Sequence, residues 1–273
     1  MIDFSKAFDF VDHDILMCKI AKLNMPSNFF NWVKSFLFGC SQVTRIGGQV
    51  SGLCNINRGI VQGSVLGPVL FTIMLSDLRT ISLINLLFKF ADDTNLLVPE
   101  NSPVDLRDEF ENIKQWSLDN KMALNFVKTK EIVFHRPSPR NFIPPAPLQG
   151  IVQIEEGVLL GVTFSSLLNF ENHVNFVLRI AGQRLYPLRL LRDQGLPVRE
   201  RTIIFKANIL SLVMYAAPAW GGFLSTHLIN KMNAFFRRSY PWGIISEALE
   251  FEDLLIMADH ELFSKIQLKA HHL

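Results

Sequence analysis

Cysteine is scarce in this chain, with three residues among 273. The three are widely spaced and form no C-x-x-C pair: Cys18, Cys40 and Cys54. An odd, scattered set excludes a disulfide-stapled scaffold and a cysteine-rich zinc module. It predicts an intracellular protein, of the nucleus or the cytoplasm, because free thiols persist in reducing compartments.

A secretory leader is also missing, because Asp3, Lys6 and Asp9 interrupt any apolar run at the chain start. The longest charge-free stretch, 207–230, contains proline and glycine, and its strictly apolar part covers only 212–224. A membrane helix needs about 20 apolar residues. We therefore predict a protein that is not secreted and has no membrane partner.

A strong overall charge is absent, since 27 Lys and Arg oppose 25 Asp and Glu, for a formal net charge of +2. The balance conceals two opposite segments. Ten Lys or Arg oppose two acids between Arg179 and Arg238, whereas six acids oppose two lysines from Ser239 to the end. A basic helical face followed by an acidic C-terminal tail is expected.

Apolar side chains are abundant, at 49% of the residues, which is enough for one large domain or two modest ones. In the first half, short apolar runs alternate with helical spacing, and Gly47-Gly48 marks a two-residue hairpin turn. Helices are expected at 12–23, 26–38, 65–78 and 103–122, and strands at 42–46, 49–56, 86–90, 94–98 and 131–135. This order predicts an α+β fold, an antiparallel sheet with helices on one face.

Five prolines between 137 and 147 interrupt the chain. Beyond them we expect a hairpin of 151–154 with 158–164, and then helices at about 170–193, 198–216, 225–240 and 246–270. The predicted organisation is a first domain at 1–136, a proline-rich linker at 137–150, a largely helical region at 151–240 and an acidic tail at 241–273.

Two acidic segments are candidates for chemistry. Asp92 and Asp93 stand between two apolar strands, at the expected turn of a hairpin. Adjacent carboxylates repel each other, and a divalent cation such as magnesium relieves that repulsion. A solvated turn is the alternative. Asp3 closes a short strand and opens the segment 3–9, which is either part of a site or a polar strand end.

A third segment, 58–68, contains three glycines and leads into an apolar helix. Glycine lets a backbone approach a ligand closely. The alternative is a tight turn that precedes a buried helix.

The order of these segments resembles the palm of a reverse transcriptase, most specifically that of the non-long-terminal-repeat (LINE-like, jockey-type) retrotransposons. Five stretches carry the resemblance: D-F-S-K-A-F-D-F-V-D-H at 3–13, Q-G-S-V-L-G-P-V-L-F at 62–71, F-A-D-D-T at 90–94, L-N-F-V-K-T at 124–129, and L-G at 160–161 followed by Phe170 and His173. The region around 201–222 is similar as well. Val61 stands where the family usually has proline.

The resemblance implies template-directed nucleotidyl transfer, in which a primer 3′-hydroxyl attacks the α-phosphate of a nucleotide. Two Mg²⁺ ions would assist the reaction. Asp3 and Asp92 would be their ligands, with Asp93 as the third acid of the set.

Further roles follow from the same resemblance. Phe8 would lie under the sugar and disfavour a 2′-hydroxyl. Gln62 and Gly63 would line the template and nucleotide side. Lys128 would be either a proton donor to pyrophosphate or a solvated lysine at a helix end.

The implied partners are an RNA template, a DNA primer and deoxynucleoside triphosphates. Residues 151–240 would then contain a primer-grip hairpin and a helical, thumb-like region. Seven basic side chains are expected to contact phosphates, or else to form a solvated helix face: Arg179, Arg184, Arg189, Arg192, Arg199, Arg201 and Lys206.

The chain begins two residues before Asp3. We therefore expect an N-terminally truncated palm and thumb, without the fingers of the family. Two functions remain open: a fragment of an RNA-directed DNA polymerase, and a catalytically inactive retrotransposon remnant that retains at most nucleic-acid binding.

Overall fold

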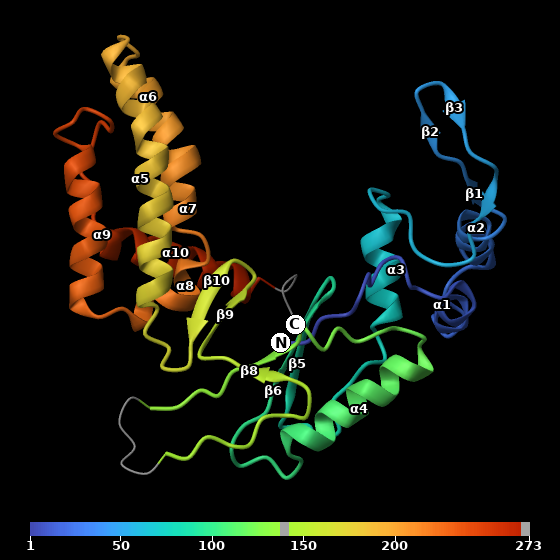
Figure 1. The fold of residues 1–273 in the computed structure, drawn as a ribbon. Helices are drawn as coiled ribbons and strands as arrows, with labels where there is room; N and C mark the ends of the chain where they lie inside the picture. Colours follow the sequence, from blue (N-terminus) through green and yellow to red (C-terminus); the bar gives the residue numbers. More distant parts are fainter. Residues whose placement is uncertain (137–141, 269–273) are drawn as a thin grey trace. The chain divides into compact units, whose positions relative to one another are not determined.

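The structure, a computed structural model, describes residues 1–136 and 142–268 (Figure 1). Part of the expected linker, 137–141, and the end of the expected tail, 269–273, lie outside the described residues. The chain divides into two compact units: Met1–Glu131 with Pro145–Ile154, and Ile132–Pro144 with Glu155–Leu273. Residues on both sides of the expected linker therefore contribute to the first unit.

Four helices belong to the first unit: α1 (His13–Ile20), α2 (Ser27–Leu37), α3 (Leu66–Met74) and α4 (Leu106–Asp119) (Figure 1). Each lies inside its predicted range. Two of them begin at an aspartate whose carboxylate accepts backbone N–H groups of the first turn, Asp12 for α1 and Asp105 for α4. Such a cap stabilises a helix by about 0.5–2 kcal/mol.

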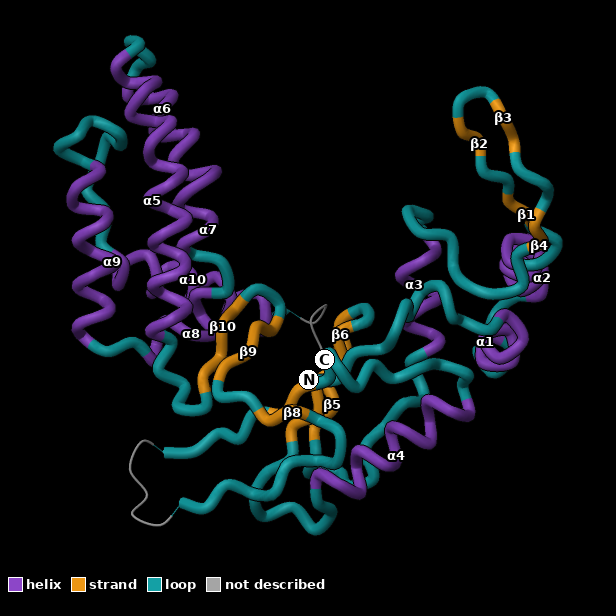
Figure 2. The backbone as a smooth tube through the Cα atoms, in the orientation of Figure 1, coloured by secondary structure: helices purple, strands orange, loops and turns teal. Residues whose placement is uncertain are grey.

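The strands of the first unit are short and pair two by two (Figure 2). In chain order they are β1 (Ser41–Gln42), β2 (Arg45–Ile46), β3 (Gln49–Val50), β4 (Cys54–Asn55), β5 (Leu86–Phe90), β6 (Asp93–Leu97), β7 (Lys130–Glu131) and β8 (Val152–Gln153). β1 pairs with β4, β2 with β3 and β5 with β6, all antiparallel, whereas β7 and β8 are parallel. The α+β class is confirmed, but the expected single sheet is divided into small pairs in the described residues.

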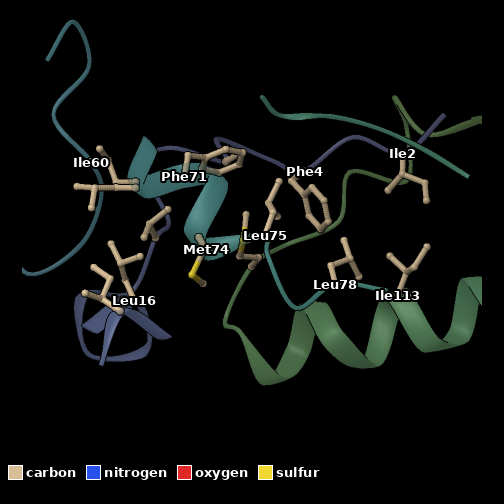
Figure 3. Packing of buried hydrophobic residues seen from close by; sticks show 14 of the residues in the cluster. Ile2, Phe4, Leu16, Ile60, Phe71, Met74, Leu75, Leu78 and Ile113 are labelled. Carbon is tan, nitrogen blue, oxygen red and sulfur yellow. The ribbon is translucent and has the colours of Figure 1, made fainter. Parts of the chain in front are cut away.

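Figure 3 shows the core of the first unit, where side chains of α1, α3, α4 and the chain start meet. Leu16, Phe71, Met74 and Ile113 are each at most 1% exposed. Burial of each such side chain contributes about 1.5–3 kcal/mol. Phe4 belongs to the same core, so the chain start is fixed to it.

Among its described residues, the second unit contains one hairpin, β9 (Glu156–Leu159) with β10 (Val162–Ser165), and a series of helical segments. In chain order its helical segments are α5 (Glu171–Asp193), α6 (Val198–Phe205), a π-helical segment (Lys206–Leu210), α7 (Ser211–Val213), α8 (Ala217–Trp220), a 3-10 turn (Gly221–Phe223), α9 (Thr226–Ser239) and α10 (Phe251–Gln267).

Two strand predictions are wrong. The expected strand 131–135 ends at Glu131, and 151–154 does not pair with 158–164. Residues 152–153 pair instead with β7, and the hairpin forms around Leu160-Gly161, which interrupts the apolar run. Both turn residues have positive φ, 47° and 82°, as a type I′ turn requires.

A long helical stretch, Val198–Phe223, passes through the core of the second unit. By length and composition it is apolar enough to cross a membrane, and no other helix in residues 1–136 and 142–268 is. Its side chains at Phe205, Ile209, Val213 and Trp220 are fully buried within the unit's own core. One side of the stretch therefore packs into the core of the unit, and the absence of a membrane partner stays a prediction.

The described part of the acidic tail is anchored to this core. Phe251, the first residue of α10, is fully buried and stacks on Trp220 with 5.8 Å between ring centroids. Asn233 of α9 accepts the backbone N–H of Phe251 at 2.7 Å and donates to the carboxylate of Glu252 at 2.8 Å. These contacts make α10 part of the helical unit.

Candidate active site

The β5–β6 hairpin places Asp92 and Asp93 at its turn. Phe90 and Asp93 form the last cross-strand pair, so Ala91 and Asp92 make a two-residue loop. Ala91 has a φ of 51°, a left-handed conformation that costs a non-glycine residue about 1–2 kcal/mol. The acidic pair is therefore held in a tight turn and lies at a fixed end of the strand pair.

The start of the chain lies along the other side of β6. Ile2 forms an antiparallel bridge with Thr94, and its N–H donates to the Thr94 carbonyl at 2.7 Å. In an antiparallel arrangement the residue after Ile2 lies opposite the residue before Thr94. Asp3 therefore lies opposite Asp93, and both side chains are on the same face. The structure thus brings Asp3 to the Asp92-Asp93 turn, about 90 residues away in sequence.

The three carboxylates influence one another electrostatically. Partial burial raises the pKa of Asp93 above its ordinary value, and the negative charges of Asp92 and Asp3 raise it further. Asp3 Oδ2 is buried and has no hydrogen-bond partner within the described residues. A buried carboxylate oxygen without a donor is an unfavourable arrangement that a cation relieves.

A loop from the L-N-F-V-K-T stretch holds the backbone of Asp3 from the other side. The Thr129 hydroxyl accepts the Asp3 N–H at 3.2 Å, and the Asp3 carbonyl accepts the Asn125 N–H at 2.8 Å. Thr129 is buried, whereas Lys128 is exposed and donates its backbone N–H to the Asn125 side chain at 3.2 Å. The loop therefore fixes Asp3 and leaves the Lys128 ammonium in solvent.

The glycine-rich segment packs directly on the residues that follow Asp3. Gly59 has a φ of 87°, and a Cβ there would meet the Asp9 carbonyl oxygen at 3.0 Å, so glycine permits this close approach. The Gly59 N–H donates to the Val11 carbonyl at 2.8 Å. Gln62 donates from Nε2 to Asp9 Oδ1 at 2.9 Å, which ties the side chain of Gln62 to the acidic segment.

Phe8 and Gly63 occupy the same region. The Phe8 ring stacks on Phe71 of α3, with centroids 4.3 Å apart, and packs at the edge of the core. Gly63 is exposed, has a φ of 82°, and has open space where a Cβ would be. Gly63 directly follows Gln62 in the glycine-rich segment, and Phe8 belongs to the acidic segment on which that glycine-rich segment packs.

The seven basic residues predicted to contact nucleic acid have different environments. Arg201 is 9% exposed and donates to the Leu196 carbonyl at 2.6 Å. Arg192 and Lys206 form ion pairs with Asp193 and Glu247.

Arg184 donates to the carbonyl of Asn208, and Arg199 is exposed on α6. Arg179 and Arg189 line a groove between α5 and α9. The seven side chains therefore do not act as one uniform basic face.

Several residues of these sites were given no role from the sequence. Asn125 and Thr129 belong to the L-N-F-V-K-T stretch, which resembles a reverse transcriptase motif. Their amide and hydroxyl side chains lie close to Lys128 in sequence, and this was the available signal for a role in the site. Asp9 likewise belongs to a motif, at residues 3–13, that carries the resemblance. Lys231 and Arg238 also line the groove. They are seven residues apart on one helix, a spacing that places both on the same face, and this was the signal in the sequence.

A divalent metal fits the chemistry of the three acids. Their donors are carboxylate oxygens, which magnesium prefers, and one of these oxygens is buried without a partner. In the described residues, however, no three His, Cys, Asp or Glu side chains are gathered into a ready-made metal site. The carboxylates are close enough to repel but are not drawn together into a ligand set.

These features define an α+β protein whose first unit carries an acidic hairpin turn, a neighbouring acidic strand and a glycine-rich loop. The family model described as "Reverse transcriptase (RNA-dependent DNA polymerase)" matches residues 1–164 of this chain. Because the match covers more than half of its length, the chain belongs to the reverse transcriptase family.

Relatives among well-described proteins come from mobile elements of Drosophila melanogaster. A probable RNA-directed DNA polymerase from transposon BS is 27% identical over 235 residues, which are 81% of this chain and 26% of the relative. The RNA-directed DNA polymerase from mobile element jockey is 26% identical over 271 residues, 91% of this chain and 29% of the relative. A third relative, from transposon X-element, is 27% identical over 83% of this chain and 26% of its own length. The chain thus spans less than a third of these relatives.

Proposed function

We propose that this chain is the polymerase segment of a retrotransposon reverse transcriptase and that it catalyses RNA-directed DNA synthesis. In this proposal the first unit acts as the palm, and the helical second unit acts as the thumb. The observation that carries it is the convergence of Asp3 on the Asp92-Asp93 turn through the Ile2–Thr94 bridge.

The three acids would hold magnesium. Asp3 and Asp92 are the proposed ligands, and Asp93 is the third acid of the set. When bound, the metal pair would supply positive charge that stabilises the charge developing during nucleotidyl transfer. Thr129 and Asn125 keep the Asp3 backbone in place, so the carboxylate is presented from a fixed strand.

Other residues of the first unit would position the nucleotide and the template. The Phe8 ring, held by stacking on Phe71, would lie under the sugar and disfavour a 2′-hydroxyl. Gln62 and Gly63 would line the template and nucleotide side, since Gln62 is tied to Asp9 and the Gly63 backbone is open to solvent. The Lys128 ammonium is exposed and would be free to give a proton to departing pyrophosphate.

The proposed substrates are an RNA template, a DNA primer and deoxynucleoside triphosphates. The names of the relatives favour this choice, because each is an RNA-directed DNA polymerase of a transposon or mobile element. Among the predicted basic residues, Arg179, Arg184, Arg189 and Arg199 lack an acidic partner within the described residues and are the better candidates for phosphate contacts.

Primer extension on an RNA template tests this function. The full chain is expected to incorporate nucleotides in the presence of magnesium and to stop when the metal is chelated. Asp92→Asn is expected to reduce the rate by about 100-fold or more, as the loss of an electrostatic stabiliser does. Asp259→Asn removes the same charge from α10 and is expected to leave the rate unchanged. Equal incorporation by wild type and Asp92→Asn would overturn the proposal.

A second function has one observation in its favour. The alternative is a catalytically inactive retrotransposon remnant that retains at most nucleic-acid binding. In its favour, the described residues contain no ready-made cluster of three metal-binding side chains. That alternative predicts salt-sensitive binding of nucleic acid without incorporation at any magnesium concentration.

A further inference from the structure

A groove of about 430 Å³ lies between α5 and α9 within the second unit, and it contains no part of the carboxylate site. Four cationic side chains and no acidic ones line it. They are Arg179 and Arg189 from α5, and Lys231 and Arg238 from α9. Positive charge from both helices therefore faces one concave surface.

The four cations in the groove have no acidic partner. Within the described residues, none of the four forms an ion pair with an acid, although Lys231 donates to the Asn175 side chain. Arg237, adjacent to Arg238 but outside the groove lining, pairs with Glu250 at 3.2 Å. Arg192 and Lys206 are likewise paired with acids. Arg184 and Arg199, outside the groove, also lack an acidic partner within the described residues. The groove gathers four uncompensated cations on one concave surface, which selects an anionic ligand.

Aromatic rings accompany this charge. Tyr186 is 62% exposed and Trp242 is 36% exposed, so each presents ring surface to a ligand. Phe235 forms the buried apolar floor. Arg189 lies over the Trp242 ring, 4.8 Å from its centroid, which orders both side chains.

The groove is also extended. Arg179, Gly182, Tyr186 and Arg189 follow one another at steps of three and four residues along α5, so they form a single stripe of about 15 Å. A Cβ at Gly182 would meet nothing within 4 Å, so this glycine leaves the middle of the groove open.

We propose that this groove binds single-stranded nucleic acid, with phosphates on the four cations and unpaired bases stacked on Tyr186 and Trp242. Alternating positive charge and aromatic surface is the combination that holds single strands. A duplex keeps its bases stacked inside and presents no free base faces to the two rings. Acidic peptides and anionic lipids would use the charge but leave the rings without a planar partner. The inference rests on the proposed function for its choice of nucleic acid among anions.

Binding of a short fluorescent oligouridine to the full chain, measured by anisotropy with the metal chelated, tests the charge. Arg238→Gln is expected to weaken binding and to reduce the slope of log K against log salt by about 0.7, as expected for one lost phosphate contact on a single strand. Arg237→Gln is the matched control, because it removes the same charge from the next residue outside the groove. Equal effects of the two substitutions would overturn the assignment of the groove.

The rings and the open centre are tested separately. Tyr186→Ala is expected to weaken oligouridine binding by about 5-fold or more and to leave duplex RNA binding nearly unchanged. Gly182→Leu fills the groove, and it is expected to fold because leucine favours a helix more than glycine does. It is expected to weaken binding by at least about 10-fold. Undiminished oligouridine binding by Gly182→Leu, or preferential binding of duplex RNA or of anionic vesicles, would contradict the proposal.

The outcome is distinguishable from failure of the proposed function. Chelation of the metal is expected to stop nucleotide incorporation and Asp92→Asn to slow it, and both are expected to leave oligouridine affinity unchanged. A chain that binds the single strand in the groove but does not incorporate nucleotides would retain this inference and lose the polymerase. If the chain incorporates nucleotides but Tyr186→Ala and Gly182→Leu bind oligouridine normally, the polymerase function is retained and the inference about the groove is lost.

Discussion

The buried hydroxyl of Thr129 accepts the backbone N–H of Asp3 at 3.2 Å, across 126 residues of sequence. With the Asn125 N–H on the Asp3 carbonyl, it holds the Asp3 backbone on both sides. The carboxylate of Asp3 is therefore positioned by a loop that follows α4, and the chain start depends on that loop for its place.

Thr129→Val removes this acceptor and keeps nearly the same shape. The substitution leaves the Asp3 N–H without a partner, so we expect a loss of about 1–3 kcal/mol in the free energy of unfolding. Thr129→Ser retains the hydroxyl and is expected to keep most of the free energy of unfolding that Thr129→Val loses. Urea denaturation of the three proteins measures the difference.

A positioning role for Thr129 has a second readout. Ile113→Val in the same core is expected to cost about 0.5–1.5 kcal/mol without touching Asp3. At a temperature where both variants remain folded, primer extension should fall in Thr129→Val and not in Ile113→Val. Equal rates in the two variants would limit Thr129 to a role in stability.

Glu109 on α4 is fully buried and organises the loop between α3 and β5. Its carboxylate accepts the backbone N–H groups of Ile81 and Ser82 and the side-chain amide of Asn85, all between 2.8 and 3.0 Å. Glu109→Gln weakens these charge-assisted bonds and turns an N–H₂ group toward donors, so we expect a loss of about 3 kcal/mol.

The matched control lies two residues away. Glu111 on the same helix is exposed and pairs with Lys114 at the surface. Glu111→Gln is expected to change stability by less than about 0.5 kcal/mol. Similar denaturation midpoints for the two variants would show that the buried carboxylate is not what holds the loop.

His173 makes the stability of the second unit depend on pH. Burial lowers the pKa of His173 below its ordinary value of about 6.5. Its Nδ1 accepts the Thr163 N–H at 3.3 Å, and its ring packs edge-on against Trp220. Protonation of Nδ1 would break that hydrogen bond and place a charge in an apolar core.

The sign follows from proton binding. As the pH falls through about 6.5, the unfolded chain takes up a proton at this histidine before the folded chain does, so stability decreases. His173→Gln keeps an acceptor and has no titration. Urea midpoints at about pH 7.5 and about pH 5 should therefore differ more for wild type than for His173→Gln, since other titrating groups are common to both. Identical differences would exclude His173 as the cause.

Leu160 occupies a left-handed position in the β9–β10 turn, with a φ of 47°, and is followed by Gly161. Asparagine adopts this conformation more easily than leucine, and Asn-Gly is the favoured pair for such a turn. We expect Leu160→Asn to raise the free energy of unfolding by about 0.5–1 kcal/mol, measured by urea denaturation. A decrease would indicate that the exposed leucine side chain contributes more than the turn strain costs.

Local patterns in the sequence were sufficient for the elements whose determinants are local. The Gly47-Gly48 turn predicted the pairing of β2 with β3, although the expected strand 49–56 ends at Val50. The apolar runs on either side of residues 91–93 predicted the β5–β6 hairpin to within one residue. The parallel pair of β7 with β8 was not predictable in this way. It joins residues about 20 apart through a ladder of two pairs, which leaves no periodic trace in the sequence.

The candidate site shows the same division. The acids and the glycines were predicted from residue type and order, and Phe8 from the resemblance to reverse transcriptases, but their partners depend on tertiary contacts. Whether Arg179 or Arg201 faces solvent is decided by packing, because both lie in the same basic helical region and only Arg201 is buried. The helical period alone does not give the pairing of Lys206 with Glu247, which spans 41 residues.

The π-helical segment Lys206–Leu210 interrupts the long helical stretch between α6 and α7. Each residue of an α-helix turns the chain by about 100°. A deletion within the α-helical part would rotate everything downstream by that amount. The i→i+5 turn of a π-helix holds one extra residue, so loss of one residue there would close it to an α-turn and leave Val213 and Ala217 in the core they now fill. This turn of the helix is thus the place where the long stretch absorbs a change in length of one residue.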